Sequence, residues 1–241
     1  MKQVYLVFLL SLSTIFGCFN NEIIEEPKVL DGNGLQALVL NSINGDKKAN
    51  DSLSGLVDFK MDENISYNYL QVDSFYLDSI KYFSVLLEYP NPIYNRFAVY
   101  DSSANCFLID KSLNGSLSFE VIELQDLKFI KVIEKFISKD TLSISRLSFY
   151  RKIDNSINLV YRSFAELKTL KSHFSQTINF ISQDSIKTQI QVPKKYKLNV
   201  KEDVFVFDSI EKKYRSNQSL FDSLVYREIA DFNVEVQKPQ I

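Results

Sequence analysis

The sequence predicts a mainly β protein, built as an antiparallel meander that forms a sandwich or a partly open barrel. Three observations favour this class. The 241 residues are 45% hydrophobic and 24% charged, so the chain can bury a sizeable core. The bulky apolar residues are 19 Phe and 13 Tyr without any Trp, and aromatic residues favour strands. Short apolar runs also alternate with Asn, Asp, Ser and Gly, which is typical of strands joined by turns.

The first half of the chain contains six apolar runs of strand length. They cover residues 55–61, 69–78, 80–89, 96–101, 105–110 and 116–124. Asn114-Gly115 separates the last two runs and is a strong hairpin signal, because both residues tolerate positive φ. Pro90-Asn91-Pro92 is interpreted either as a boundary inside the domain, near 90–92, or as an ordinary loop between strands.

The second half alternates apolar and polar residues with a period of two. Its predicted strands cover residues 141–153, 156–164, 176–182, 185–192, 203–210 and 223–236. Successive alternating strands with short turns predict a meander with one buried face and one solvent-exposed face.

Four further segments are less regular. The segments 127–139 and 164–174 have polar residues at helical spacing, and each is interpreted either as a short helix or as a strand. The stretches 31–34 and 44–51 have the composition of calcium loops but not the ligand spacing, so they are predicted to be turns.

The N-terminal residues have the layout of an export signal. Lys2 precedes an apolar run from Val4 to Phe16, which is shorter than the roughly 20 residues of a transmembrane helix. The run ends in Ile15-Phe16-Gly17-Cys18, which resembles the lipobox of bacterial lipoproteins. In that class the signal peptidase cleaves before the cysteine, and the cysteine thiol carries a diacylglycerol.

This resemblance implies a division of the chain and a location in the cell. The implied parts are a signal peptide (1–17), a lipidated Cys18 with a polar tether (18–31), and a single mainly β domain (32–241). Phe19 rather than Asp follows the cysteine, so the resemblance implies the outer membrane of a Gram-negative envelope, with the periplasmic or surface side left open. The membrane is then a partner through the lipid anchor.

One short motif is more frequent than the composition predicts. Asp followed by Ser or Thr and then Ile or Leu occurs six times, against roughly one match expected by chance. The hydroxyl groups belong to Ser52, Ser79, Thr141, Ser185, Ser209 and Ser223. The tripeptide resembles the acceptor of a general O-glycosylation system for exported proteins in one group of Gram-negative bacteria. Asp-Ser pairs also bond their own backbone in turns, so a purely structural interpretation stays open.

Candidate catalytic residues are few. His173 is the only histidine, which excludes a zinc site built from several histidines, and no Gly-x-Ser-x-Gly elbow accompanies it. Ser209 and Lys212 match Ser-x-x-Lys, but the other motifs of penicillin-recognising enzymes are missing. Cys106 has no disulfide partner if Cys18 is acylated, and we expect it to be a buried apolar residue. The sequence therefore predicts no catalytic residue, metal or cofactor.

The sequence is compatible with three functions. The net charge of −2, with scattered Lys and Arg, predicts no nucleic-acid partner. The leading hypothesis is a non-enzymatic binding or structural module for a glycan, a peptide or an envelope protein. The residues Tyr67, Tyr69, Tyr76 and Tyr82 are its candidate contacts, although such aromatics are more often core.

The two alternative functions each require a specific structural feature. A surface glycan or peptide hydrolase would use paired carboxylates, either Glu120 with Glu123 or Asp58 with Asp62. A carrier of a hydrophobic ligand in a β half-barrel would need a large apolar cavity.

Overall fold

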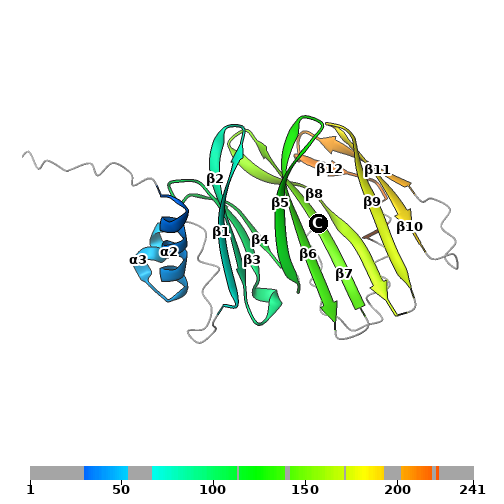
Figure 1. Ribbon diagram of the computed structural model, residues 1–241. Helices are drawn as coiled ribbons and strands as arrows, with labels where there is room; N and C mark the ends of the chain where they lie inside the picture. Colours follow the sequence, from blue (N-terminus) through cyan, green and yellow to red (C-terminus); the bar gives the residue numbers. More distant parts are fainter. Residues whose placement is uncertain are drawn as a thin grey trace, which may run out of the picture.

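The computed structural model describes residues 30–53, 67–112, 114–138, 142–170, 172–192, 202–218 and 221–222. These residues form two antiparallel sheets and two short helices (Figure 1). The smaller sheet has the strand order β1-β2-β3-β4, and the larger sheet runs in sequence from β5 to β12. The predicted mainly β class and the antiparallel meander are confirmed, and the described strands do not close into a barrel.

The helices are α2 (Gly32–Ile43) and α3 (Lys47–Ser52), and a 3-10 turn, η2 (Pro92–Tyr94), follows the second strand. The smaller sheet consists of β1 (Tyr69–Leu77), β2 (Ile80–Glu88), β3 (Arg96–Tyr100) and β4 (Cys106–Lys111). The larger sheet consists of β5 (Ser116–Leu124), β6 (Leu127–Ser138), β7 (Leu142–Ile153), β8 (Ser156–Thr169), β9 (His173–Ser182), β10 (Ser185–Gln191), β11 (Glu202–Asp208) and β12 (Lys213–Arg215). The strands predicted at 55–61 and 223–236 lie outside the described residues, and the other predicted strands are present.

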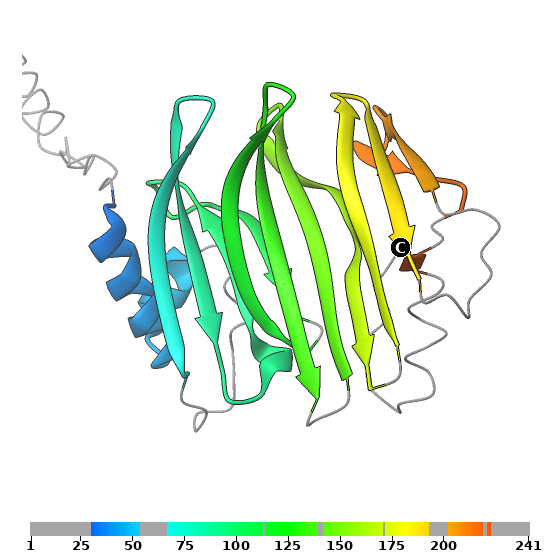
Figure 2. The same ribbon diagram turned by 45° about the vertical axis from the view of Figure 1, so that its right-hand side comes forward.

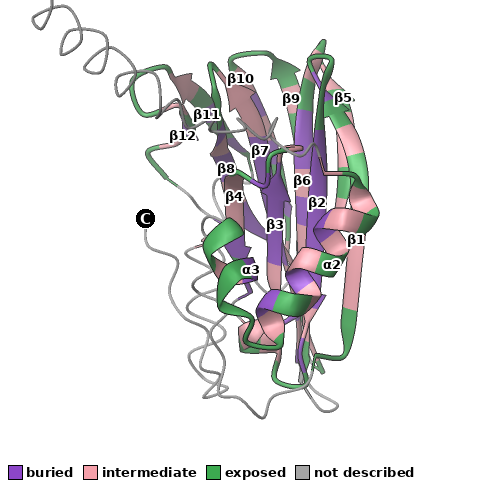
Figure 3. Cartoon of the chain, turned by 90° about the vertical axis from the view of Figure 1, so that its left-hand side faces the viewer, coloured by how far each residue is buried: buried purple, intermediate pink, exposed green. Residues whose placement is uncertain are grey.

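The elements stack in layers. Helices α2 and α3 cover one face of the smaller sheet, where Leu35, Val39 and Leu53 pack against Phe83 and Val85 (Figure 3). The other face of that sheet packs against β5–β8. Residues from both sheets form this second core: Leu77, Tyr82, Leu86, Phe97, Val99, Leu117, Ile130, Val132, Tyr150 and Ile157. Each sheet thus removes an apolar face from water, which is the main favourable term for such a stack.

The larger sheet bends between β8 and β9. These strands pair only over Glu166–Lys168 with His173–Ser175, whereas β7 and β8 pair along nearly their whole length. Beyond the bend, β9–β12 curl over the outer face of β5–β8. Ring contacts join the two halves, with 5.0 Å between the centroids of Phe129 and Phe180 and 5.1 Å between those of Tyr161 and Phe205.

Of the two interpretations of 127–139 and 164–174, the strand is correct and the helix is wrong in the part of these segments that the structure describes. The first segment is strand β6, and the second contains the end of β8 and the beginning of β9. Strand β6 lies in a middle layer, with Ile130 facing the smaller sheet and Phe129 facing β9–β12. A strand buried on both faces loses the two-residue alternation, and its few polar positions then matched a helical spacing by chance.

The turn expected at 31–34 is wrong, because α2 begins there, and the turn expected at 44–51 is confirmed only at Asn44 and Gly45, because α3 begins at Lys47. Asp31 is the N-cap of α2 and accepts a hydrogen bond of 2.7 Å from the Gly34 N–H. Asp46 caps α3 in the same way and accepts from the Lys48 N–H at 2.8 Å. Aspartate makes the same short-range bond to the backbone in turns and at helix N-termini, so the local sequence does not separate the two.

Asn114-Gly115 does not form the expected hairpin. Strand β4 pairs with β3 and β5 pairs with β6, so the two residues connect one sheet to the other. Glycine is required here by a close approach, since a Cβ at Gly115 would lie 2.6 Å from the carbonyl oxygen of Lys135. The Gly115 carbonyl oxygen accepts hydrogen bonds from Asn95 Nδ2 and Ser112 Oγ, both at 2.8 Å.

Two ion pairs with buried carboxylates lie at the contact between the sheets. Arg146 on β7 bonds Glu134 on β6 at 2.6 Å, with about 4–5% of each side chain exposed. Arg162 on β8 reaches Asp110 on β4 at 2.7 Å and also donates to the Tyr150 hydroxyl. Charges this deep require partners, because an unpaired one costs several kcal/mol. The Arg162–Asp110 pair therefore specifies how the two sheets are placed on each other.

Candidate ligand-binding cleft

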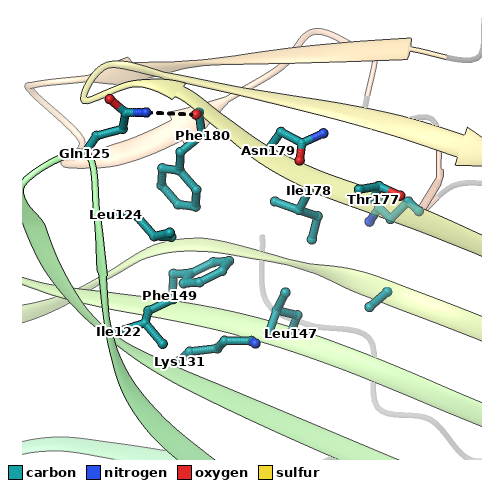
Figure 4. Close-up of a pocket in the computed structure, with 12 residues that line it drawn as sticks. Ile122, Leu124, Gln125, Lys131, Leu147, Phe149, Thr177, Ile178, Asn179 and Phe180 are labelled. Carbon is teal, nitrogen blue, oxygen red and sulfur yellow. Dashed lines mark hydrogen bonds between the residues drawn. The ribbon is translucent and has the colours of Figure 1, made fainter.

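A cleft of about 600 Å³ lies between β9 and the strands β5, β6 and β7 (Figure 4). Its floor is apolar and consists of Ile122, Leu124, Leu147, Phe149 and Ala165. Strand β9 supplies Ile178 and Phe180 from the opposite side, and both side chains point toward this floor. The volume falls within the range of roughly 300–1,000 Å³ that is usual for small-molecule sites.

The bend between β8 and β9 creates the cleft. Because β9 leaves β8 after a short stretch of pairing, it crosses above the sheet and leaves space below it. At one end the Gln125 amide donates to the Phe180 carbonyl at 3.4 Å, and the Phe180 ring packs on Phe149. At the other end buried Gln176 donates to Ser163 Oγ at 2.6 Å. Side-chain contacts to β9 thus hold the space open between two fixed ends.

Five of the lining residues are polar: Gln125, Lys131, Gln176, Thr177 and Asn179. Lys131 supplies the charge among the described lining residues, and its ammonium group is paired with the Glu120 carboxylate. Thr177 and Asn179 are exposed on β9. An apolar floor beside this number of polar groups suits an amphipathic molecule.

The carboxylate pairs considered for hydrolysis do not converge in this cleft. Glu120 and Glu123 are both exposed and lie three residues apart on β5, so their side chains point to opposite faces of the strand. Asp58 and Asp62 lie outside the described residues. The buried acids Asp110 and Glu134 are paired with arginines between the sheets.

The other candidate catalytic residues lie apart from one another. His173 is exposed near the bend, and its Nε2 lies 2.6 Å from Glu166 Oε1. Ser209 and Lys212 both lie in the turn between β11 and β12, and Lys212 Nζ bonds Asp154 at 2.9 Å. Within the described ranges, Cys, His and acidic side chains do not gather in threes as metal ligands would.

Cys106 is half-buried and packs against the core beneath the helices. Burial raises the pKa of its thiol, which lies 3.5 Å from the Leu108 carbonyl oxygen. A thiol in such surroundings is a poor nucleophile at neutral pH. Cys18, the predicted lipidation site, lies outside the described residues.

The four tyrosines proposed as contacts divide into two kinds. Tyr82 is 2% exposed and belongs to the core between the sheets, in a ring contact with Phe107. Tyr67, Tyr69 and Tyr76 lie before or along β1 and are 36%, 47% and 56% exposed. None of the four lines the cleft, so they form no part of this site.

The Asp-Ser and Asp-Thr hydroxyls lie in turns and at the ends of elements. Ser79 and Ser209 are exposed in turns, Ser52 is exposed at the end of α3, and Ser185 is half-buried at the start of β10. Thr141 and Ser223 lie outside the described residues. Asp78 and Ser79 both have positive φ, at 48° and 66°, and form a two-residue hairpin turn. This geometry gives Asp-Ser a structural role here, and glycosylation stays a prediction.

The sequence matches no known protein-family model, and no curated protein is significantly similar to it. Neither helix in the described part of the chain has the length and apolar character needed to cross a bilayer.

Proposed function

We propose that this protein is a lipid-anchored envelope protein whose β domain binds a small apolar or amphipathic molecule in the cleft between β9 and β5–β7. The cleft itself carries the proposal on binding, since it combines a volume of about 600 Å³ with an apolar floor. Among the functions considered from the sequence, this feature favours the carrier of a hydrophobic ligand.

Binding would gain free energy from apolar side chains that the fold leaves partly exposed to water. Ile122, Leu124, Ile178 and Phe180 all line the cleft and are only half-buried. A ligand that covered them would remove apolar surface from water, at about 25 cal/mol for each Å². Its polar part would lie toward Lys131 and Glu120, which can donate and accept hydrogen bonds.

Binding can be tested on the full-length protein with N-phenyl-1-naphthylamine, an apolar dye whose fluorescence rises in apolar sites. Ala165→Phe fills the floor of the cleft, and Ile178→Asp places a carboxylate beside it. We expect each change to weaken dye binding by about tenfold or more, since an unpaired charge or a lost apolar contact costs at least 1–3 kcal/mol. The matched control is Ile181→Asp on the same strand, because Ile181 is 54% exposed and not part of the lining.

Unchanged dye affinity in both cleft variants, with circular dichroism like that of the wild type, would contradict the proposed site. Organic extraction of protein purified from its native host, followed by mass spectrometry, then identifies the natural ligand.

The anchor is supported by Ile15-Phe16-Gly17-Cys18, the short apolar run before it and the polar residues after it. Phe19 after the cysteine supports the outer membrane. Cys18→Ala should remain uncleaved and unacylated, and intact mass measures both properties at once. Normal maturation of that variant would refute the anchor and leave the cleft unaffected.

A further inference from the structure

Five turns of the β structure gather at one end of the domain, which we call the hairpin end. They join β1 to β2, β5 to β6, β7 to β8, β9 to β10, and β11 to β12 (Figure 2). Contacts between neighbouring turns hold them together. Lys152 lies 3.7 Å from Asp78, Lys212 lies 2.9 Å from Asp154, and Gln183 Nε2 donates to the Gln125 carbonyl at 3.1 Å. The Tyr214 hydroxyl on β12 donates to the Gln183 carbonyl at 2.6 Å and links the two groups of turns, so the hairpin end is one continuous surface.

This surface exposes large apolar side chains. They are Tyr76 (56% exposed), Ile80 (46%), Ile181 (54%), Val206 (57%) and Ile210 (91%). Strand register places all five within a few residues of a turn, and Ile210 lies in the turn between β11 and β12. An Ile at the tip of a turn adds nothing to the core, so its apolar surface stays available to a partner.

The chain reaches the fold at this same end. The Leu30 N–H donates to the Ser102 carbonyl at 2.8 Å, and Ser102 follows β3 directly. Tyr100 on β3 pairs with Phe83, which is three residues from the turn between β1 and β2. The turn between β3 and β4, which contains Ser102, is therefore a sixth turn at the hairpin end. Roughly 12 residues separate Cys18 from Leu30, and a chain of that length spans about 40 Å at most.

Three ion pairs lie at the hairpin end, which also exposes the acids Asp126 and Asp184 in its turns. Lys152 with Asp78 and Lys212 with Asp154 form pairs of opposite sign between turns. Arg215 and Glu211 form a third pair beside Ile210. Paired charges at the margin of an apolar surface tolerate the interface between headgroups and water, where the polar groups stay hydrated.

We propose that the hairpin end rests on the lipid surface, with Ile80 and Ile210 inserted at the boundary between headgroups and acyl chains. This inference depends on the proposed lipid anchor at Cys18, which brings the domain to the membrane. The strands then stand upright on the bilayer, and the opposite end, with Ile137 and Leu170, points away from it. Insertion of the aliphatic tips adds to the anchor and fixes the orientation of the domain.

The absence of Trp from the chain allows a direct test. Full-length acylated protein carries one Trp, at Ile210→Trp or at the control position Ile137→Trp, and is reconstituted in phosphatidylethanolamine and phosphatidylglycerol vesicles with brominated acyl chains. Ile137 is 75% exposed on β6, ten residues from the turn between β5 and β6, or about 30 Å along the strand. We expect bromine to quench the blue-shifted emission of the Ile210→Trp variant, and to leave the emission of the Ile137→Trp variant unchanged.

The possible results distinguish failure of the docking from failure of the lipid anchor. If the protein floats with the vesicles but bromine quenches neither Trp, the docking is overturned and the anchor is left intact. Protein that fails to float, with an intact mass that lacks acyl chains, would refute the proposed anchor and, with it, the docking. A glycan on Ser79 or Ser209 in protein from the native host would also overturn the docking, because it would hold Ile80 and Ile210 off the surface.

Discussion

The ring of Phe180 on β9 lies 5.2 Å from the ring of Phe149 on β7, with their planes at 85°, so the strand that leaves the sheet is packed back onto it. Phe180 also contacts Phe129 at 5.0 Å and Tyr214 at 5.8 Å. One half-buried side chain thus joins strands from both halves of the larger sheet.

Phe180→Ala should lower the free energy of unfolding by about 2 kcal/mol, less than the 3–5 kcal/mol of a fully buried Phe. Urea denaturation monitored by circular dichroism measures the loss. The neighbouring change Ile181→Ala, at an exposed position, should shift stability by no more than about 0.5 kcal/mol. Equal effects from the two changes would contradict the role assigned to Phe180.

Removal of one partner from the buried ion pair should be costly. Arg146→Met leaves the Glu134 carboxylate without its arginine in a site about 5% exposed, and the expected loss of stability is about 3–5 kcal/mol. Lys187→Met breaks an exposed pair with Glu202 and should cost about 1 kcal/mol or less. Chemical denaturation compares the two, and a small loss in Arg146→Met would mean that water or relaxation compensates the charge.

Gly115→Ala should destabilise the connection between the sheets. A Cβ at this position meets backbone atoms of Lys135 at 2.6 and 2.8 Å, so the backbone itself has to move, and we expect a loss of about 1–3 kcal/mol. Gly32→Ala is the matched control, since it adds a methyl group at the start of α2 with its nearest contact at 3.9 Å. Thermal unfolding should show a lower midpoint for the first variant and little change for the second.

The stability contributed by Asp222 should fall as pH rises. Burial raises the pKa of this carboxyl above the ordinary value of 3.8, with a further contribution from the negative charge of Asp203. The folded state therefore keeps a proton that the unfolded chain has released. This contribution is complete below the ordinary pKa and is lost as pH rises through the raised one.

Asp222→Asn removes this titration and keeps an oxygen for the hydrogen bonds from Ser163 Oγ and the Phe164 N–H. The stability of the variant relative to the wild type should increase from about pH 4 to about pH 7. Urea midpoints across this range measure the difference. A difference that stays constant with pH would show that the carboxyl titrates normally.

The strands with one solvent-exposed face could be predicted from the sequence. In β10, Ile186, Thr188 and Ile190 are buried and alternate with more exposed residues, as a period of two requires. In β6 both faces are covered, and the same criterion left helix and strand undecided. The capped helix α2 was missed because Asp31 marks a turn and a helix start equally well.

The cleft could not be predicted, because it depends on contacts between residues distant in the chain. Gln125 and Phe180, whose hydrogen bond lies at one end of the cleft, are 55 residues apart. The sequence does show Ile178 and Phe180 in alternation on β9, and this alternation indicates that the strand has one apolar face. It does not say that this face lies above a floor formed by β5, β7 and β8.

The middle position of β5–β8 also has a consequence for how the sequence can vary. A substitution at a buried position of β6, such as Phe129 or Ile130, meets β9–β12 or the smaller sheet, so these positions offer no room for a larger or polar side chain. Helix α3 and the outer face of β11 have solvent on one side. In a saturation mutagenesis library we expect the fewest tolerated substitutions along β6 and β7, and a tolerant sequence at both outer layers.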